Sequence, residues 1–501
     1  MGPATNRGAP TPPIGFPGGA AAVTARIDGG RVDLDDAFVE RLGAPGAHMT
    51  RADEVVGEAS RDWWPLAMIW ALGDQVGARA SAVVRTDSVE QVQAVLRMCN
   101  ERHVPVTAAA GRSGVCGASV PVFGGVLLDL TALAGIVDVD ATSLLVDVLP
   151  GTFGDVFEDQ LRAEHGLTSG HWPQSMALST VGGWLACRGA GQMSTRYGKI
   201  EDIVTGLDVV LADGTLVTTG GAPRAAVGPD LTQLFVGSEG TLGIIVGARL
   251  RAHPSPAAEG RGAYAFESFT AALDAMRRVV QRGATPAVLR LYDAIEADRT
   301  YHTGDANVLL VLDEGDAHIV DATMHVVAEE CSRAQPIDVA LVEQWMGHRN
   351  DVSALEALVQ RGFVVDTMEI SAPWRALPTI YERTTAAMRA VEHTLVASAH
   401  QSHSYTDGAC LYFTFAGRPP EDRREAYYRS IWEVGQRTVL EHGGALSHHH
   451  GVGLNRARFV PEALGAAFGV LTAVKQVLDP NGILNPGKLG LPSPFGTVAW
   501  P

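Results

Sequence analysis

The chain has few cysteines and no arrangement of them that would hold a metal or a disulfide framework. Its 501 residues include five cysteines, an odd number, and no two of them form a Cys-x-x-Cys pair. This argues against a structural zinc site and against a disulfide-stapled fold. We therefore expect no metal, and the cysteine usage fits a reducing, cytoplasmic environment.

The sequence also lacks a positive net charge and long apolar runs. Its 39 Lys and Arg residues stand against 56 Asp and Glu, which gives a formal net charge of −17. A surface this acidic repels nucleic acid and anionic lipid, so neither is expected as a general partner. No apolar run approaches the ~20 residues that span a bilayer, so no transmembrane segment is expected.

The start of the chain carries no pattern typical of a signal peptide. Residues 1–19 are rich in Pro and Gly, and they lack a basic region followed by an apolar core. We expect this stretch to be disordered.

The chain does contain an alternation of short strands and helices that begins near Ala80, and its length predicts two or three domains. A helix begins at Ser88, where Gln91 completes a capping box. Residues 253–258 form a Pro-containing linker that marks a domain boundary. The predicted strands are 82–84, 104–107, 126–130, 144–148, 208–211, 216–218, 244–250 and 287–291, and further helices are predicted at 153–163, 268–282 and 461–477.

Three glycine-rich segments carry the first functional signal. Residues 108–117 (Ala-Ala-Ala-Gly-Arg-Ser-Gly-Val-Cys-Gly) follow a predicted strand, and their backbone N–H groups suit a diphosphate, although a plain surface loop is the alternative. Residues 173–184 (Pro-Gln-Ser-Met-Ala-Leu-Ser-Thr-Val-Gly-Gly-Trp) suit a backbone wrapped around a flat ring system, or tight helix packing through Gly182 and Gly183. Residues 237–243 (Gly-Ser-Glu-Gly-Thr-Leu-Gly) form a close-approach turn with one charge.

In this order and spacing, the three segments resemble the FAD-binding domain of the vanillyl-alcohol oxidase/p-cresol methylhydroxylase family, from about Ala80 to Leu250. The closing segment 479–488 (Asp-Pro-Asn-Gly-Ile-Leu-Asn-Pro-Gly-Lys) resembles the C-terminal signature of that family. The resemblance implies an α+β fold, in which an FAD-binding domain of two α/β subdomains (PCMH type) is joined to an α+β cap domain with an antiparallel sheet. The implied domains are a disordered start with an N-terminal segment (1–50), the FAD-binding domain (51–254), the substrate or cap domain (255–444) and a C-terminal return to the FAD domain (445–501).

The resemblance also implies which residues bind FAD. Many relatives attach the flavin through a His in Arg-Ser-Gly-Gly-His, but Cys116 stands in that place here. Non-covalent FAD is therefore expected, and a covalent link at Cys116 is the alternative. The implied FAD-binding residues are Ala109, Ala110, Gly111, Arg112, Ser113, Gly114, Gly117, Gln174, Ser175, Ser179, Thr180, Gly183, Arg188, Gly189, Glu239, Gly240, Thr241, Gly243, Ile244, Ile245 and Asn485.

Two segments of the second half carry ionisable groups. Residues 403–415 read as a turn at Asp407-Gly408 that leads into a strand, and alternation turns Tyr412 away from the core face, toward either a polar cavity or solvent. His448, His449 and His450 follow in Ser-His-His-His-Gly. Neighbours on an extended strand alternate sides, so these three cannot all face one metal. Histidines near a flavin suit proton transfer, whereas a chance surface cluster is the alternative.

These two segments, with Pro-Ala-Val-Leu-Arg-Leu at 286–291, resemble the alkyldihydroxyacetonephosphate synthases within the same family. That resemblance implies an acyl-to-alkyl exchange on a ketone phosphate at flavin N5, which forms an ether bond without net redox. Tyr412 would be the base, His448, His449 and His450 the essential cluster, and Arg290 the active-site arginine. It also implies a small-molecule substrate with a lipid-like chain and a homodimer.

One departure from the synthases keeps a second hypothesis open. Upstream of Glu-Ile-Ser-Ala-Pro-Trp (369–374), the stretch 354–358 lacks the phosphate-contacting arginine of the synthases. Arg349 is the nearest substitute, and it lies where related 2-hydroxy-acid oxidoreductases carry a substrate arginine. An FAD-dependent oxidase or dehydrogenase of a 2-hydroxy acid or another alcohol is therefore the second hypothesis. A non-catalytic FAD-binding protein is the third.

Overall fold

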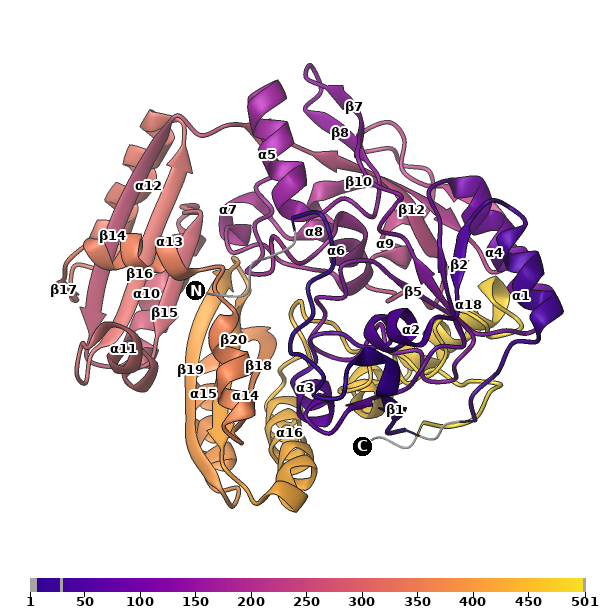
Figure 1. Cartoon of the computed structure of the whole chain (residues 1–501). Coiled ribbons are helices and arrows are strands. Elements are labelled where there is room, and N and C mark those ends of the chain that lie inside the picture. The colour runs from indigo at the N-terminus through magenta and orange to yellow at the C-terminus, as the bar shows by residue number, and fades with distance from the viewer. Residues whose placement is uncertain (1–6, 28–29, 499–501) are drawn as a thin grey trace.

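The computed structural model describes residues 7–27 and 30–498. Its larger β-sheets have four, five and seven strands, and Figure 1 shows them with their covering helices. The four-stranded and five-stranded sheets, drawn in indigo to magenta, make one half of the molecule, and the seven-stranded sheet makes the other. The C-terminal chain, drawn in yellow, runs back to the first half. The predicted α+β architecture with an antiparallel cap sheet is confirmed.

The four-stranded sheet has the order β2-β4-β6-β5, and its β4, β6 and β5 strands are parallel. Helix α4 (Val89–Glu101) covers it and begins as predicted, because the Ser88 side chain accepts a hydrogen bond from Gln91 N. The other elements of this part are β1 (Thr24–Ala25), α1 (Asp36–Gly43), β2 (His48–Thr50), α2 (Asp53–Ala59), α3 (Pro65–Ala71), β3 (Gln75–Val76), β4 (Ala82–Arg85), β5 (Val106–Ala109) and β6 (Val126–Asp129).

The five-stranded antiparallel sheet has the order β11-β10-β12-β8-β7. The predicted hairpin between β10 and β11 forms, and Gly214 at its turn has φ +81°, a conformation that favours glycine. The elements of this part are β7 (Ile136–Asp140), β8 (Leu145–Val148), α5 (Gly154–His165), β9 (Leu167–Thr168), α6 (Val181–Cys187), α7 (Ser194–Tyr197), α8 (Ile200–Ile203), β10 (Val204–Val210), β11 (Leu216–Thr218), α9 (Thr232–Phe235), β12 (Ile244–Arg251) and β13 (His253–Pro254).

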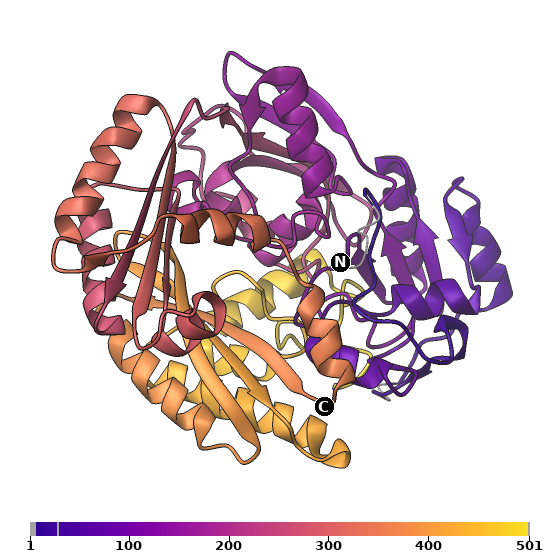
Figure 2. The ribbon, with the colours of Figure 1, turned by 60° about the vertical axis from the view of Figure 1, so that its left-hand side comes forward.

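The seven-stranded cap sheet has the order β17-β14-β16-β15-β19-β20-β18 and is antiparallel throughout. Figure 2 brings its long strands forward. Its elements are β14 (Ala258–Phe266), α10 (Phe269–Gln281), β15 (Val288–Tyr292), α11 (Ala294–Tyr301), β16 (Asn307–Gly315), α12 (Ala317–Glu330), β17 (Gln335–Pro336), α13 (Ala340–His348), α14 (Ser353–Gln360), β18 (Val364–Pro373), α15 (Leu377–Arg389), β19 (Thr394–Ser404), β20 (Gly408–Gly417) and α16 (Arg424–Glu441).

The first residues of the described chain are packed. Ile14 is 3% exposed and lies in a small cluster with Met68 and Ala71. Trp63 Nε1 donates a hydrogen bond to Thr11 O at 2.9 Å. The expected disorder is therefore wrong for residues 7–19, because Ile14 gives this Pro- and Gly-rich segment an apolar anchor. Residues 1–6, which share the prediction, lie outside the described chain.

The predicted helix at 461–477 is two helices, α17 (Val460–Leu464) and α18 (Ala467–Leu478). The break falls at Gly465, whose φ of +52° and ψ of −129° leave the helical region. Among the described residues no single helix is long and apolar enough to cross a membrane; only the pair Ala457–Leu464 and Ala467–Leu478, bent by 118°, passes on length and composition together.

Candidate active site

The three glycine-rich segments, which are far apart in the sequence, meet at one place. A Cβ added to Gly111 would collide with the Leu178 carbonyl, so the first loop lies directly on the second. Glu239 N donates to Ala186 O at 2.9 Å, which joins the third segment to α6, the helix that begins within the second segment. Asn485 Nδ2 donates to Glu239 O at 2.7 Å and brings in the C-terminal signature.

The backbone at this junction suits a bound cofactor. Arg112, Arg188, Glu239 and Asn485 have φ angles of 54°, 59°, 51° and 39°, which non-glycine residues rarely adopt. Such strain gathers at functional sites. A Cβ added at Gly114 would meet Asp62 Oδ2 at 3.8 Å, and one at Gly240 would meet the Ala108 and Ile244 side chains at 4.0 Å, so neither backbone is crowded by the rest of the protein. The loops therefore fit a ligand that lies against the main chain.

Several predicted FAD-binding side chains have partners within the protein. Thr180 caps α6 by accepting from Gly183 N, and Ser179 Oγ accepts from Trp184 Nε1 at 2.7 Å. Ile244 and Ile245 begin β12 and are core residues. Direct contacts between these side chains and FAD stay predictions.

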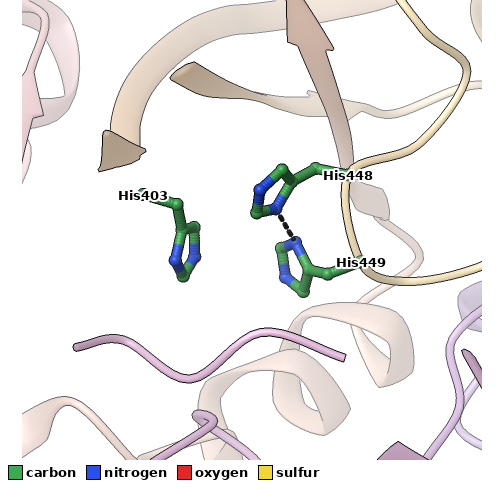
Figure 3. Close-up of side chains that lie close together, drawn as sticks. All are labelled: His403, His448 and His449. Carbon is green, nitrogen blue, oxygen red and sulfur yellow. Dashed lines mark hydrogen bonds between the residues drawn. The ribbon is translucent and has the colours of Figure 1, made fainter. Parts of the chain in front are cut away.

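Tyr412 faces a buried group of histidines. Leu411, Phe413 and Phe415 are fully buried in the core, as alternation on β20 predicted, and Tyr412 points the other way. Its hydroxyl lies 2.7 Å from His403 Nε2 and 3.2 Å from His449 Nε2. Figure 3 shows His403 facing His448 and His449 across this space.

His403 reaches the site through a β-bulge that the sequence did not reveal. The pairing of β19 with β20 shifts between Ser402 and Ser404, and His403 has φ 59°. A bulge redirects a side chain that strict alternation would send to the other face. The Asp-Gly turn that follows was the only nearby signal in the sequence.

Burial keeps this group uncharged at neutral pH. It raises the pKa of Tyr412 well above its ordinary range and lowers the pKa of His403, His448 and His449 well below theirs. Burial also lowers the pKa of His450 to about 4. The phenol and the imidazoles are therefore neutral, a state in which each imidazole both donates and accepts a hydrogen bond.

Glu369 holds the loop that carries the histidines, and sequence reasoning did not select it. Its carboxylate accepts from His448 N, from Ser447 Oγ at 2.7 Å and from His450 N at 2.9 Å. The Arg456 guanidinium donates to the same carboxylate at 2.9 Å, and both side chains are fully buried. Although burial alone would raise the pKa of Glu369, Arg456 brings it below its ordinary value.

A second carboxylate ties this loop to the cofactor-binding segments. Glu239 accepts from Val452 N and from Gly453 N, the latter at 2.9 Å. The side chain of Glu239 is thus engaged with the histidine loop, while its main chain belongs to the third glycine-rich segment. The two halves of the site are therefore fixed relative to each other.

The expectation that His448, His449 and His450 alternate along a strand is wrong, because they lie in a bend. Nitrogen atoms of His403, His448 and His449 lie within 4.8 Å of one another, a spacing that could hold a metal ion. Each of their six ring nitrogens has a hydrogen-bond partner, however. The absence of a metal stays a prediction.

Arg290 and Arg349 line one cavity of about 370 Å³. Their guanidinium carbons lie 5.9 and 5.7 Å from the centroid of the same Trp345 ring. Among the described residues, neither guanidinium has a carboxylate within 4.0 Å, and Arg349 Nη1 has no hydrogen-bond partner. The other lining residues are Gln174, Gln192, Tyr292, Thr300, Tyr301, Gln344, Trp345 and His348.

Arg349 in this cavity stays positively charged although it is partly buried. Burial lowers the pKa of Arg349 only to about 10, so the guanidinium is positive at neutral pH. A desolvated guanidinium without a carboxylate is matched best by a bound anion. The cavity therefore suits a substrate with a negatively charged group.

The cavity and Tyr412 share one face of the cap sheet. Arg290 Nε donates to Tyr292 Oη at 2.6 Å, and Tyr292 pairs with His400 on the neighbouring strand. His400 in turn pairs with Tyr412, and the two rings stack with centroids 4.4 Å apart. A continuous row of polar side chains thus joins this cavity to the phenol.

The comparisons with known proteins fit this geometry. Residues 80–220 match the model of an FAD binding domain, and residues 255–489 match the C-terminal domain of FAD linked oxidases. An uncharacterised FAD-linked oxidoreductase of Escherichia coli O157:H7, YgcU, is 33% identical over 431 residues, which cover 82% of this chain and 88% of the relative. The chain belongs to the FAD-linked oxidase family.

More distant relatives divide between two reactions. Alkyldihydroxyacetonephosphate synthase of Dictyostelium discoideum is 28% identical over 479 residues, 88% of this chain and 77% of the relative. Glycolate oxidase subunit GlcD of Bacillus subtilis is 28% identical over 440 residues, 83% of this chain and 90% of the relative. A solved alkyldihydroxyacetonephosphate synthase shares the fold, with a TM-score of 0.77, 24% identity and coverage of 95% of this chain and 89% of that chain. The predicted family and its FAD cofactor are confirmed, and the protein is an FAD-dependent enzyme.

Proposed function

We propose that this FAD-dependent enzyme oxidises a small alcohol that carries an anionic group, and that a 2-hydroxy acid is the simplest such substrate. The observation that carries the proposal is the pair of arginines, Arg290 and Arg349, that line one cavity without a carboxylate partner. A partly buried charge without a carboxylate in contact is costly, and a substrate anion relieves that cost.

The residues take distinct roles. Arg349 binds the anionic group, and Tyr412 receives the hydroxyl proton, with His403 and His449 as its hydrogen-bond partners. Arg290 lies close enough to Tyr412 to favour negative charge on the phenol oxygen. When bound, FAD would supply the acceptor for the hydride, which is the carbon-bound hydrogen together with its electron pair.

The size and lining of the cavity favour a short substrate. Ligand pockets span about 300–1,000 Å³, and the cavity of about 370 Å³ lies near the lower end of that range. Most lining side chains are polar, which suits a compact hydroxy acid better than a long acyl chain. The glycolate oxidase relative is named for oxidation of such an acid.

The second candidate is the acyl-to-alkyl exchange of the alkyldihydroxyacetonephosphate synthases, on a substrate with a lipid-like chain. The observation that favours it is the position of Tyr412 between two imidazoles, within segments that resemble those enzymes. Arg349 would then bind the phosphate. The family resemblance also suggests a homodimer, which sedimentation of the holoenzyme would test.

An anaerobic titration distinguishes the two candidates. The oxidised holoenzyme is mixed with a panel of 2-hydroxy acids and small alcohols while its visible absorption is recorded. Loss of the oxidised-flavin bands with one of them supports the first candidate. If no donor bleaches the flavin, acyl-dihydroxyacetone phosphate and a fatty alcohol are supplied, and formation of the ether product supports the second.

A further inference from the structure

The hydrogen bonds around Tyr412 close on themselves. We propose that Ser194 and Tyr405 are positioning residues that complete a ring of six proton-carrying groups, and that this ring disperses the proton which Tyr412 takes from the substrate. The inference rests on the proposed function only for the origin of that proton. In order, the ring consists of Tyr412, His403, Ser194, Tyr405, His448 and His449.

The first half of the ring leaves Tyr412 through His403. Tyr412 Oη lies 2.7 Å from His403 Nε2, and His403 Nδ1 lies 2.7 Å from Ser194 Oγ. Ser194 Oγ lies 3.2 Å from Tyr405 Oη. Ser194 begins α7, next to the second glycine-rich segment, whereas His403 belongs to the cap sheet. This half of the ring therefore bridges the FAD-binding part and the cap.

The second half returns through the histidine loop. Tyr405 Oη lies 3.0 Å from His448 Nε2, and His448 Nδ1 lies 2.9 Å from His449 Nδ1, the contact drawn in Figure 3. His449 Nε2 closes the ring at 3.2 Å from Tyr412 Oη. Both nitrogens of every imidazole are thus used within the ring.

The number of protons matches the number of contacts. A neutral imidazole supplies one N–H and one acceptor nitrogen, and a hydroxyl supplies one O–H and accepts as well. Three imidazoles and three hydroxyls therefore offer six protons for six contacts. Every contact receives one proton only if all three imidazoles are neutral, which is the state that burial favours.

The protons can run around the ring in either direction. In one, His403 and His448 carry hydrogen on Nδ1 and His449 on Nε2, and Tyr412 donates to His403. In the other, all three tautomers reverse, and Tyr412 donates to His449. The direct Nδ1 contact between His448 and His449 requires these two neighbours to be opposite tautomers. Passing from one direction to the other moves six protons and no net charge.

The ring gives the substrate proton a place to go. When Tyr412 accepts a proton from the substrate hydroxyl, it passes its own proton to His403 or to His449. The excess positive charge is then shared among three imidazoles, while the carbon-bound hydrogen leaves the substrate with its electron pair, as a hydride. Ser194 and His403 are almost fully buried, so bulk water is kept from this half of the ring. Without the hydroxyl of Ser194 or Tyr405, the ring becomes an open chain.

The first test measures the protonation of the ring histidines in the resting enzyme, without turnover. Holoenzyme labelled with ¹⁵N-histidine is compared by NMR in the wild-type, Ser194→Ala, Ser194→Thr and Tyr405→Phe forms. We expect three neutral imidazoles with slowly exchanging N–H protons in the wild type. Ser194→Ala and Tyr405→Phe should shift these resonances and accelerate their exchange, and Ser194→Thr, which keeps a hydroxyl, should restore them. Tyr427→Phe is the matched control, because Tyr427 Oη bonds Thr394 in the cap, away from the ring.

The second test measures the proton transfer during the reaction. With a substrate that bleaches the flavin, the rate is measured in mixtures of H₂O and D₂O. Transfer of several protons gives a bowed dependence on the deuterium fraction, and we expect Tyr405→Phe to make it linear while the flavin absorption of the resting enzyme is unchanged. Unaltered histidine resonances in both Ser194→Ala and Tyr405→Phe would overturn the ring. If no substrate bleaches the flavin, the proposed function fails, and the NMR comparison still decides on the ring.

Discussion

Glu369 lies directly opposite Tyr412 in the pairing of β18 with β20, and its carboxylate fixes the loop that brings His449 to the phenol. Glu369 therefore influences the position of Tyr412 through strand pairing and the position of His449 through the loop. Because the Arg456 guanidinium is paired with it, the Glu369 carboxylate stays ionised although it is fully buried. The geometry of the proton-transfer group thus depends on one buried ion pair.

We predict that Glu369→Gln destabilises the protein strongly. The substitution leaves the Arg456 charge buried without its partner, and loss of one member of a buried pair costs about 3–5 kcal/mol. Urea unfolding of the holoenzyme measures the change. The control is Glu433→Gln, because Glu433 forms half-exposed pairs with Arg437 and Arg458 and should cost under about 1 kcal/mol. Equal losses in the two variants would contradict the role of Glu369.

We predict that Tyr412→Phe slows the reaction and leaves the cofactor bound. Removing a group that transfers a proton typically costs about 10²–10⁴-fold in rate. The rate of flavin bleaching by the substrate should fall by this order, while the visible absorption of the resting enzyme is retained. Tyr427→Phe, which removes a hydroxyl elsewhere in the cap, should retain the wild-type rate. Full activity in Tyr412→Phe would exclude Tyr412 as the base in both candidate reactions.

We predict that the purified holoenzyme contains no stoichiometric metal. All six ring nitrogens of His403, His448 and His449 are engaged in hydrogen bonds, so a metal would have to break several of them. Elemental analysis of the holoenzyme, before and after dialysis against a chelator, measures the content. One metal ion per chain that is lost together with activity would contradict the prediction.

We predict that stability declines at acid pH because buried imidazoles must take up protons. The pKa of His450 is lowered by burial to about 4, from an ordinary value of 6.5. Above pH 6.5 the His450 imidazole is neutral in both the folded and the unfolded chain. Below that value the unfolded chain binds a proton that the folded chain excludes, so stability is lost down to about pH 4, by up to about 1.4 kcal/mol per pH unit.

The free energy of unfolding, measured between pH 7 and pH 4, tests this assignment. His450→Asn should decline less steeply with falling pH than the wild type, since it has no imidazole to protonate. His318→Asn, at an exposed position on α12, should keep the wild-type slope. An unchanged slope in His450→Asn would show that this imidazole is not held neutral by the fold.

Much of this architecture could be predicted from the sequence because its signals are local. The Ser88 cap, the Asp213-Gly214 hairpin and the core face around Tyr412 depend on residues close together in the chain. The glycine-rich segments identified the FAD-binding half through the family they resemble. Local sequence patterns were therefore sufficient to predict these helices and strands and the class of cofactor.

The rest depends on contacts between distant segments. His403 reaches the site through a bulge that exists only in the pairing of β19 with β20, and Glu369 meets the histidine loop only once the sheet has formed. The break at Gly465 interrupts a sequence that reads as one helix. The bend at 448–450 likewise replaced the expected strand, because the Glu369 carboxylate binds the main-chain N–H groups of His448 and His450.

The most direct test of the central claim compares two substrates that differ only in charge. Oxidised holoenzyme is mixed without oxygen with a 2-hydroxy acid that bleaches it, and separately with the corresponding 2-hydroxy amide. We predict that only the acid bleaches the flavin at low concentration. Arg349→Met should raise the concentration of acid required by roughly 10–100-fold. Arg361→Met, at an exposed site, should have no such effect. Equal bleaching by acid and amide, or an Arg349→Met enzyme that responds to the acid like the wild type, would contradict the proposal that this cavity binds a substrate anion.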